Sequence, residues 1–348
     1  MKKVQYFIGI DLHKTVLQVC VLNKAGEIDE EFRQRLDETD AETEVLQRLR
    51  RWKANGQYVV EAQGLNRWFV NACQAVGMRI LVAHPPTLNL KRSGKKTDRR
   101  DAYELARRLW LGDIEKHART YYPADEEYGK RKVLRVRHKC VALRQQVINQ
   151  LRGVLGAYRI PAPQTVLYTP PSLAKLERVE RPTPELTFCV QTLVTVLKAL
   201  QQAIIPLTRQ ITQCAEAPRV ATLQEQLPSV GPQTALTLDV ELGDLTRFGS
   251  AKQLCSYAGL VPRVTDSADR QNHGRLTKRG NAEVRWILGQ WALRLLASNP
   301  QVQAWATARA RRLHKNKVRV ALARRLLVGI FVSQHKGEPF SLQRCLAT

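Results

Sequence analysis

The chain has 348 residues, 44% of them hydrophobic, and its 56 Lys and Arg exceed its 31 Asp and Glu, for a formal net charge of +25. This hydrophobic fraction excludes a disordered chain, and the length predicts two or three domains. A field of this sign attracts polyanions, among which nucleic acid is the commonest in a cell and a membrane surface is the alternative. The longest apolar run near the C-terminus, LLVGIFV, is too short to span a bilayer.

The N-terminus and the cysteines indicate a protein of the reducing cytoplasm. In MKKVQYFIGIDLHK the basic start resembles that of a signal peptide, but Asp11, His13 and Lys14 interrupt the apolar region early. The seven cysteines are scattered, odd in number and without a CxxC pair, which predicts neither a disulfide framework nor a zinc site. We therefore expect a cytoplasmic, nucleoid-associated protein without a membrane partner.

Residues 1–118 alternate strand and helix patterns. The segment YFIGIDLHKTVLQVCVLNKAG predicts two strands that turn near residues 11–14, and GEIDEEFRQRL predicts a third strand. The acids that crowd residues 27–44 are typical of a solvated face. There follow a helix in DAETEVLQRLRRWKANG, capped by Asp40 and ended by Gly56, the strand QYVVEA, the helix LNRWFVNACQAVG, the strand MRILVA and the helix DRRDAYELARRLWLG. This order predicts an α/β domain with a mixed sheet.

The middle of the chain, residues 119–219, is predicted to be a helical hairpin or coiled coil. Residues 128–159 carry nine Lys or Arg and no acid in a strongly helical pattern, and a second helix is expected over 185–216. The proline-rich segment 160–184 between them is expected to be a loop at the tip. A spacer or dimer arm and a direct contact with nucleic acid remain equal alternatives for this hairpin. Residues 220–348 are expected to form a third, mainly helical domain.

Four acids stand where solvation alone is a poor explanation. Asp11 and Glu61 each end an apolar strand, where a core-facing carboxylate is costly without a partner. Asp98 and Asp101 share one face at the start of a helix, where salt bridges and the helix dipole are the alternative explanation. Because ligands collect at the carboxyl ends of strands in open α/β sheets, the four acids predict a site for Mg²⁺ or Mn²⁺. Two such ions about 3.5–4 Å apart can clamp the attacking and leaving oxygens of a phosphodiester. The cations expected to hold the nucleic-acid backbone there are Lys95, Lys96, Arg99 and Arg100.

Three strings around these acids resemble the motifs of a known family. GIDLHK, VVEAQG and KTDRRDAYELA are similar to the D, E, D and D motifs of the RuvC-like, RNase H-fold domain in DEDD transposases of bacterial insertion sequences, the insertion sequence 110 family. The matching residues are Asp11, Glu61, Asp98 and Asp101. The resemblance implies a RuvC-like fold for residues 1–118 and a catalytic site that binds two Mg²⁺ ions.

A second set of motifs lies in residues 220–348. LPSVGPQTA resembles a helix-hairpin-helix turn that binds phosphate, with Ser229 at its usual first glycine, and an ordinary helix connection is the alternative. FGSAKQLCSYAGLVPR and GRLTKRGNAEVRWIL resemble the transposase domain of the same family, in which a serine after Gly-Leu-x-Pro-Arg attacks DNA. Ser267 matches this serine, although Ala268 stands where glycine is usual. The cations close enough in sequence to stabilise a five-coordinate phosphate are Arg263, Arg270, Arg275, Lys278 and Arg279.

The resemblance covers nearly the whole chain and implies an activity and partners. It implies a DNA recombinase that mobilises its own insertion sequence, acts on donor and target DNA and uses a guide (bridge) RNA encoded by the element. It also implies a homo-oligomer, dimer or tetramer, in which the metal domain of one subunit meets the serine domain of another. A DNA invertase that reads its sites through protein contacts and a RuvC-like junction nuclease that uses metal-activated water are the alternatives. A non-catalytic nucleic-acid chaperone is disfavoured by the acids at the strand ends. An aromatic content of 6% favours contacts with the backbone over base stacking.

Overall fold

The chain consists of two compact units, Met1–Pro123 and Ala124–Thr348. The computed structural model describes residues 4–85, 97–160, 168–178, 182–267, 270–277 and 279–347, with the backbone alone for 263–267 and 270–275. Lys95, Lys96 and Lys278 therefore lie outside the described residues. The three-domain division at residues 118 and 219 stays a prediction.

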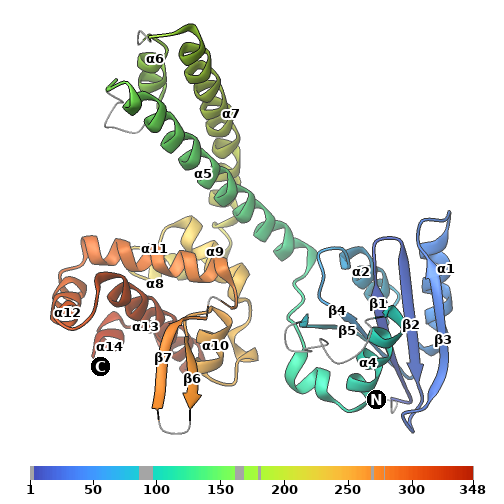
Figure 1. Ribbon diagram of the computed structural model, residues 1–348. Coiled ribbons are helices and arrows are strands. Elements are labelled where there is room, and N and C mark those ends of the chain that lie inside the picture. The colour runs from blue at the N-terminus through green and yellow to red at the C-terminus, as the bar shows by residue number, and fades with distance from the viewer. Residues whose placement is uncertain are drawn as a thin grey trace. The chain divides into compact units, whose positions relative to one another are not determined.

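The first unit contains the mixed sheet that the sequence predicts (Figure 1). Its strands are β1 (Tyr6–Leu12), β2 (Val16–Leu22), β3 (Ile28–Arg35), β4 (Gly56–Glu61) and β5 (Ile80–Ala83). They lie in the order β3-β2-β1-β4-β5, with β1 and β3 antiparallel to β2 and with β4 parallel to both β1 and β5. This order is consistent with the RNase H-like fold that the resemblance implies.

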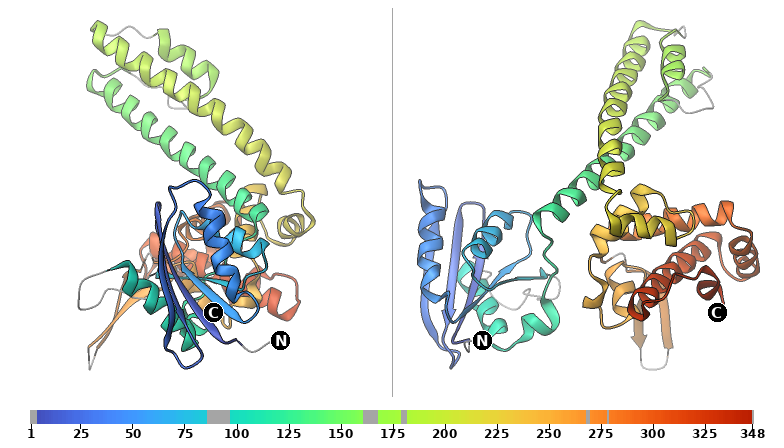
Figure 2. Two further views of the ribbon diagram at one scale, coloured as in Figure 1. Left: turned by 90° about the vertical axis from the view of Figure 1, so that its right-hand side faces the viewer. Right: turned by 180° about the vertical axis from the view of Figure 1, so that it is seen from behind.

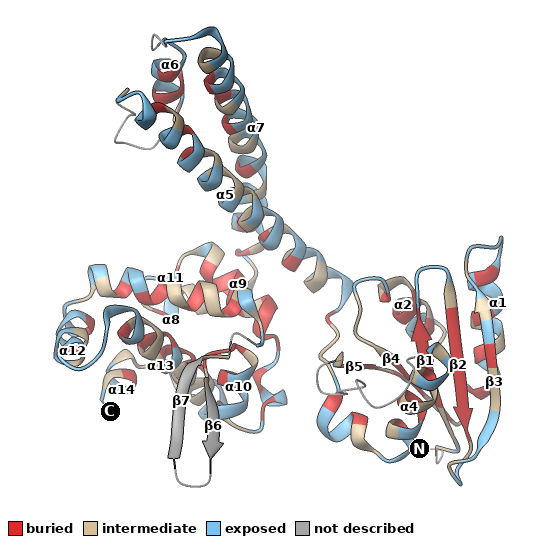
Figure 3. Cartoon of the chain, in the orientation of Figure 1, coloured by how far each residue is buried: buried red, intermediate tan, exposed pale blue. Residues whose placement is uncertain are grey.

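Helices cover both faces of this sheet. On one face α1 (Ala41–Leu49) and α2 (Arg67–Ala75) pack against alternate side chains of the strands, among them Ile8 and Ile10. On the other face α4 (Asp98–Trp110) contributes Leu105 and Leu109 to a core with Val59. In the first unit, Figure 3 shows β1 and β2 as largely buried strands. Both faces of the central strands are buried, because a helix covers each of them.

The first helix differs from the prediction at both ends. Asp40 precedes α1 with a left-handed backbone, φ 66°, and its side chain makes no capping hydrogen bond. The helix ends at Leu49 and continues as the 3₁₀ turn η1 (Arg50–Trp52), and Gly56 begins β4 rather than ending the helix. A second short element, the π turn η2 (Ile114–Ala118), follows α4.

The second unit begins with the two long helices that the sequence predicts, α5 (Asp125–Ala157) and α7 (Pro184–Cys214). They lie side by side in both views of Figure 2, and Leu151 of α5 and Val194 of α7 belong to one buried cluster. The proline-rich segment is not all loop, because Pro170–Arg178 forms the helix α6, whose Leu173 and Leu176 join the same cluster. Proline is tolerated there because it stands in the first turn of α6.

Among the described helices, α7 is the one that is long and apolar enough, by length and composition alone, to cross a membrane. Its side chains Val190, Val194 and Leu197 are buried against α5 and α6. This packing accounts for part of its apolar composition.

The rest of the second unit is mainly helical and surrounds a core that includes the fully buried Trp291. Its helices are α8 (Pro218–Gln226), α9 (Pro232–Leu242), the 3₁₀ turn η3 (Leu245–Arg247), α10 (Ala251–Tyr257), α11 (Ala282–Ser298), α12 (Pro300–Ala310), α13 (Lys315–Lys336) and α14 (Leu342–Leu346). One feature was not predicted. Between α10 and α11 the antiparallel strands β6 (Pro262–Ser267) and β7 (Arg270–Leu276) form a hairpin.

Candidate active site

The alternation of side chains along β1 and β4 directs the strand-end acids toward α4. In β1, Ile8 and Ile10 face the core beneath α1 and α2, so Gly9 and Asp11 face the opposite side. Ile10 pairs with Val60 in the parallel β4, and Glu61 follows Val60 as Asp11 follows Ile10. The register therefore places Asp11 and Glu61 next to each other at the carboxyl ends of adjacent strands.

Gly9 brings α4 against this face of the sheet. A Cβ atom on Gly9 would collide with the backbone of Ala102 and Ala106, both fully buried in α4. Small residues on both elements thus allow the helix and the strand to approach closely. Thr97 begins the helix by accepting a hydrogen bond from the Arg100 backbone N–H, and the first turn then carries Asp98 and Asp101.

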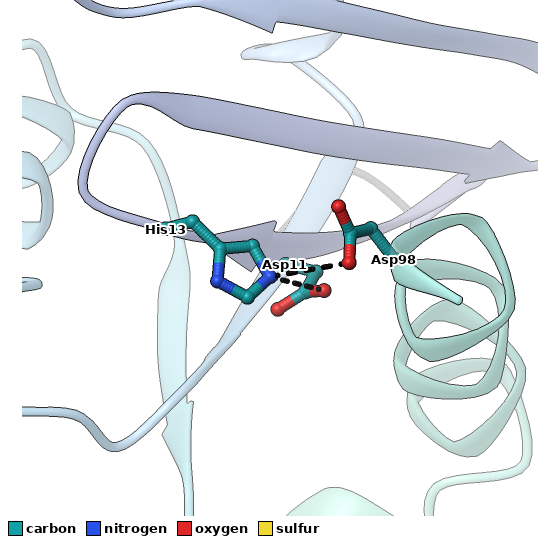
Figure 4. A group of neighbouring side chains, drawn as sticks. All are labelled: Asp11, His13 and Asp98. Carbon is teal, nitrogen blue, oxygen red and sulfur yellow. Dashed lines mark hydrogen bonds and ion pairs between the residues drawn. The ribbon is translucent and has the colours of Figure 1, made fainter. Parts of the chain in front are cut away.

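Three side chains meet at the end of β1 (Figure 4). His13 Nε2 lies 3.2 Å from Asp11 Oδ2 and 3.4 Å from Asp98 Oδ1. Their potential ligand atoms all lie within 4.8 Å of one another. Asp11 is 4% exposed, whereas Asp98 and His13 are each 45% exposed at the side chain, so the cluster is open to solvent on one side.

Burial raises the pKa of Asp11 above its usual value, the nearby His13 opposes this shift, and the charges of Asp101 and Asp98 add to it. Both helix acids are therefore electrostatic neighbours of Asp11. A buried carboxylate that faces two further acids is stabilised when positive charge lies among them. The arrangement suits a cation site of oxygen ligands.

The sequence motifs do not predict His13 as a member of the site, because in the sequence it only interrupts the apolar start. The spacing between His13 and Asp11 indicates this membership. Residues two apart in an extended segment share a face, and His13 therefore lies beside Asp11.

The cations predicted around these acids are only partly described. Arg99 is exposed and ion-pairs with Glu31 of β3, and Arg100 is exposed at the helix surface. The role of these residues in holding nucleic acid stays a prediction.

Ser267 is the last residue of β6 and pairs with Arg270 of β7. It therefore lies at the end of a strand. The side chains of Ser267 and of the predicted cations Arg263, Arg270 and Arg275 lie outside the described part of the chain. Arg279 is described and exposed, at the end of the hairpin that leads into α11.

Two glycines close the base of this hairpin. Gly259, φ 67°, and Gly280, φ 111°, both have backbone conformations that favour glycine. A Cβ on Gly259 would collide with the Arg279 carbonyl oxygen, and one on Gly280 would collide with the Tyr257 carbonyl oxygen. The two segments that carry the motifs of the second unit, around Gly-Leu-x-Pro-Arg and Lys-Arg-Gly-Asn, thus pack backbone against backbone.

The same two regions match models of protein families. Residues 8–160 match the model of a transposase family with the DEDD motif, and residues 221–306 match that of the transposase IS116/IS110/IS902 family. The chain belongs to the IS110 family of DEDD transposases. It is thus a transposase of the kind that mobilises an insertion sequence.

Known transposases of bacteria resemble most of its length. The transposase for insertion sequence element IS1111A of Coxiella burnetii is 25% identical over 324 residues, which cover 91% of this chain and 86% of that protein. A probable family 20 transposase of Pseudomonas aeruginosa is 25% identical over 76% of this chain and 79% of its own length. A putative transposase of Sinorhizobium fredii, y4rJ, is 27% identical over 78% of this chain and 76% of its own.

Proposed function

We propose that this IS110-family transposase cuts and rejoins DNA with a two-metal acidic site and a serine nucleophile. The observation that carries the proposal is the meeting of Asp11 and Asp98 at the carboxyl end of β1, with Asp101 near them and Glu61 adjacent by register. Asp11 is nearly fully buried, and besides His13 its charged neighbours are the acids Asp98 and Asp101, which a salt-bridge role alone does not explain.

The four acids fit divalent cations by their donor chemistry. Asp11, Glu61, Asp98 and Asp101 offer hard oxygen ligands, the type that Mg²⁺ and Mn²⁺ prefer. Bound Mg²⁺ would neutralise negative charge that develops on the phosphate oxygens. His13 supports this fit, since its Nε2 lies within 3.4 Å of oxygens of both Asp11 and Asp98 and would be a further ligand atom for a bound cation.

In the proposed chemistry Ser267 Oγ attacks a phosphorus of DNA and displaces one deoxyribose hydroxyl. The product is a phosphoserine ester that keeps the phosphodiester energy, so a hydroxyl of another strand can reverse the step without an added energy source. A serine needs an adjacent cation, base or metal for this attack. The cations nearest in sequence are the arginines of β6 and β7, Lys278 and Arg279.

The turn between α8 and α9 supports a phosphate contact in the same unit. Ser229 has a left-handed backbone, φ 59°, at the position where a helix-hairpin-helix turn usually has glycine. The turn is held in place by Trp291 Nε1, which donates to the Pro228 carbonyl oxygen at 2.8 Å. The helix start that follows can present backbone N–H groups to a phosphate.

The partners proposed are donor and target DNA, a guide RNA encoded beside the gene, and further copies of the chain. The RNA and the oligomer rest on the resemblance, and the high positive charge is compatible with binding more than one strand. Sequencing the RNA that co-purifies with the protein, together with the DNA that flanks the gene, tests the guide. A specific RNA encoded by the element supports it, and random cellular RNA would favour the invertase alternative.

The test of the chemistry is the covalent intermediate. The wild-type protein with labelled DNA and Mg²⁺ should give a slower band that survives denaturation on a protein gel. Ser267→Ala should remove the band and recombination, because no hydroxyl remains to form the ester, and Asp11→Asn should remove them through loss of a metal ligand. Both variants should keep nucleic-acid affinity within about threefold, since phosphate contacts dominate binding.

Control reactions separate this mechanism from hydrolysis. Replacing Mg²⁺ by Ca²⁺ should keep the complex and stop cleavage, because Ca²⁺ has looser coordination. If the wild type forms no adduct and Ser267→Ala cleaves at the wild-type rate, the serine mechanism is wrong and the RuvC-like hydrolytic nuclease replaces it. If Asp11→Asn cleaves normally, the metal-site assignment is wrong.

A further inference from the structure

A fully buried carboxylate lies outside the site described above. Glu241, near the end of α9, is 0% exposed. Arg135 of α5 donates from Nε to Glu241 Oε1 and from its terminal nitrogen to Oε2, both at 2.9 Å. Asn281 Nδ2 donates to Glu241 Oε2 at 2.8 Å. A buried charge with one bidentate arginine and one amide donor is a complete network, and removal of a single member leaves the others unpaired.

One stripe of α5 makes the two Arg135 hydrogen bonds and three further contacts. Arg131, Arg135 and His138 are spaced by four and three residues, so they lie on one face of the helix. Arg131 donates from Nε to the Val240 carbonyl oxygen at 2.6 Å, and His138 Nδ1 lies 2.8 Å from Glu283 Oε2. The His138 ring also stacks on Trp286, with centroids 4.0 Å apart. The stripe therefore holds the end of α9 and the first turns of α11 together.

Asn281 joins this network to the base of the β6–β7 hairpin. Its backbone N–H donates to the Tyr257 carbonyl oxygen at 2.7 Å, and its side chain lies 3.3 Å from the Tyr257 hydroxyl, which itself donates to the Glu241 carbonyl oxygen at 2.9 Å. Beside this contact Gly259 and Gly280 pack backbone to backbone, and the Thr277 N–H donates to the Val261 carbonyl oxygen at 3.1 Å. The hydrogen bonds of Asn281 to Tyr257 thus join the segment that precedes β6 to the segment that follows β7.

We propose that Asn281 and Glu241 are positioning residues whose hydrogen bond fixes the base of the β6–β7 hairpin to helix α5, so that alignment of the hairpin's end for attack depends on α5. The proposal rests on the proposed function in one respect, namely that Ser267 is the reacting group. In this proposal α5 helps to position the nucleophile, in addition to any role that the helix has as a spacer or dimer arm.

The alternative is that Asn281 only caps α11. Its two functions use different atoms, and this makes them separable. Oδ1 accepts from the Glu283 and Val284 N–H groups and caps the helix, whereas Nδ2 donates to Glu241. Asn281→Asp keeps an oxygen that can cap but replaces the donor with a second carboxylate oxygen. Asn299 caps α12 by accepting from the Val302 N–H, so Asn299→Asp is the matched control in the same unit.

The experiment uses the full chain in three variants. Asn281→Asp should slow covalent adduct formation from the preformed DNA complex about 10- to 100-fold, because a small misplacement of a reacting group costs that much. DNA affinity should stay within about threefold, and Asn299→Asp should leave both quantities unchanged. Asn281→Ser, which keeps a cap without a second charge, should slow the adduct similarly if Asn281→Asp folds poorly.

A reciprocal exchange tests the hydrogen bond itself. Adding Glu241→Gln to Asn281→Asp restores the hydrogen bond between these two side chains with its polarity reversed. The introduced glutamine keeps one oxygen for Arg135 Nε and loses the second Arg135 hydrogen bond, because Oε2 of Glu241 accepts from both Arg135 and Asn281. Adduct formation should be faster than in Asn281→Asp alone and slower than in the wild type. If the double variant is as slow as Asn281→Asp alone, or if Asn281→Asp forms the adduct at the wild-type rate, the positioning role is wrong.

Hydrogen exchange gives a readout that does not depend on chemistry. In the protein without nucleic acid, backbone amides of residues 262–277 should exchange about tenfold faster or more in Asn281→Asp and at the wild-type rate in Asn299→Asp. An unchanged exchange rate in Asn281→Asp overturns the inference. A wild type that forms no adduct instead contradicts the proposed function, while the exchange experiment still decides whether this network holds the hairpin.

Discussion

Asp11 keeps a carboxylate almost completely out of water, which is costly unless partners compensate it. Burial raises its pKa, and His13 is the partner that opposes this shift. The buried carboxylate of Glu241 is compensated differently, because Arg135 and Asn281 donate hydrogen bonds to both of its oxygens. The first carboxylate faces other acids at an open edge, and the second is closed within a network. This contrast is the reason why we propose cation binding for Asp11 and positioning for Glu241.

The cysteines provide a test of burial in both units. Burial raises the pKa of Cys20 and Cys73 to about 12 and that of Cys345 to about 11, whereas Cys189 is exposed. At pH 8 without nucleic acid, iodoacetamide should therefore modify Cys189 first and leave Cys20, Cys73 and Cys345 unmodified, as read by peptide mass spectrometry. In guanidinium all seven should react. Fast labelling of Cys73 in the native protein would contradict the packing of the first unit.

The same shifts set a direction for alkaline stability. These thiols ionise near pH 9.0 when unfolded and only near pH 11–12 when folded. The folded state thus retains protons that the unfolded state releases, so the free energy of unfolding should fall as pH rises from about 9 toward 12.

The approach of α4 to β1 is the contact between elements that builds the candidate metal site. The first turn of α4 carries Asp98 and Asp101, and Gly9 allows the helix to lie close enough to bring them to Asp11. Gly9→Ala should therefore lower the free energy of unfolding by about 1–3 kcal/mol, the usual cost of overpacking. It should also reduce Mg²⁺-dependent cleavage, measured with labelled DNA.

Gly153→Ala is the matched control for this change. Gly153 lies inside α5, and a Cβ there would meet no atom within 4 Å. Because alanine favours a helix by about 0.5–1 kcal/mol over glycine, this variant should be as stable as the wild type or slightly more so. Normal stability and cleavage in Gly9→Ala would show that α4 can withdraw from β1 without consequence.

The positive charge of the chain is distributed unevenly between its two compact units. Residues 124–348 hold 34 Lys and Arg against 15 Asp and Glu, whereas residues 1–123 hold 22 against 16. The second unit thus supplies a net charge of +19, from the same counts, and the first only +6. We expect the second unit to provide most of the contacts with phosphates.

Salt dependence measures this distribution. The logarithm of the DNA affinity should fall linearly with the logarithm of salt concentration, because each phosphate contact releases counterions. Arg311 and Arg312 are exposed in the second unit, and Arg311→Gln with Arg312→Gln should reduce the slope by about 2 if each contacts one phosphate. Arg35→Gln is the control, since Arg35 already pairs with Asp37. Equal slopes for the double variant and the wild type would remove these two arginines from the interface.

Local patterns were sufficient for much of the fold and of the candidate site. The apolar, β-branched runs in YFIGIDL and QYVVE predicted buried strands that carry an acid near the end. The helix with Asp98 and Asp101 followed from its local sequence pattern, and the structure shows Thr97 as its cap. These features depend on neighbours in the chain, and a single sequence therefore contains them.

Contacts between distant residues were decided only in the tertiary structure. His13 joins Asp98 across 85 positions, and Asn281 joins Glu241 across 40. The helix α6 forms in a proline-rich segment because Leu173 and Leu176 are buried against α5 and α7, which outweighs its weak local preference. The β6–β7 hairpin likewise begins and ends where Gly259 meets Arg279 and Gly280 meets Tyr257. Each of these features depends on which surfaces pack together, and burial, which local periodicity does not encode, supplies the free energy for that choice.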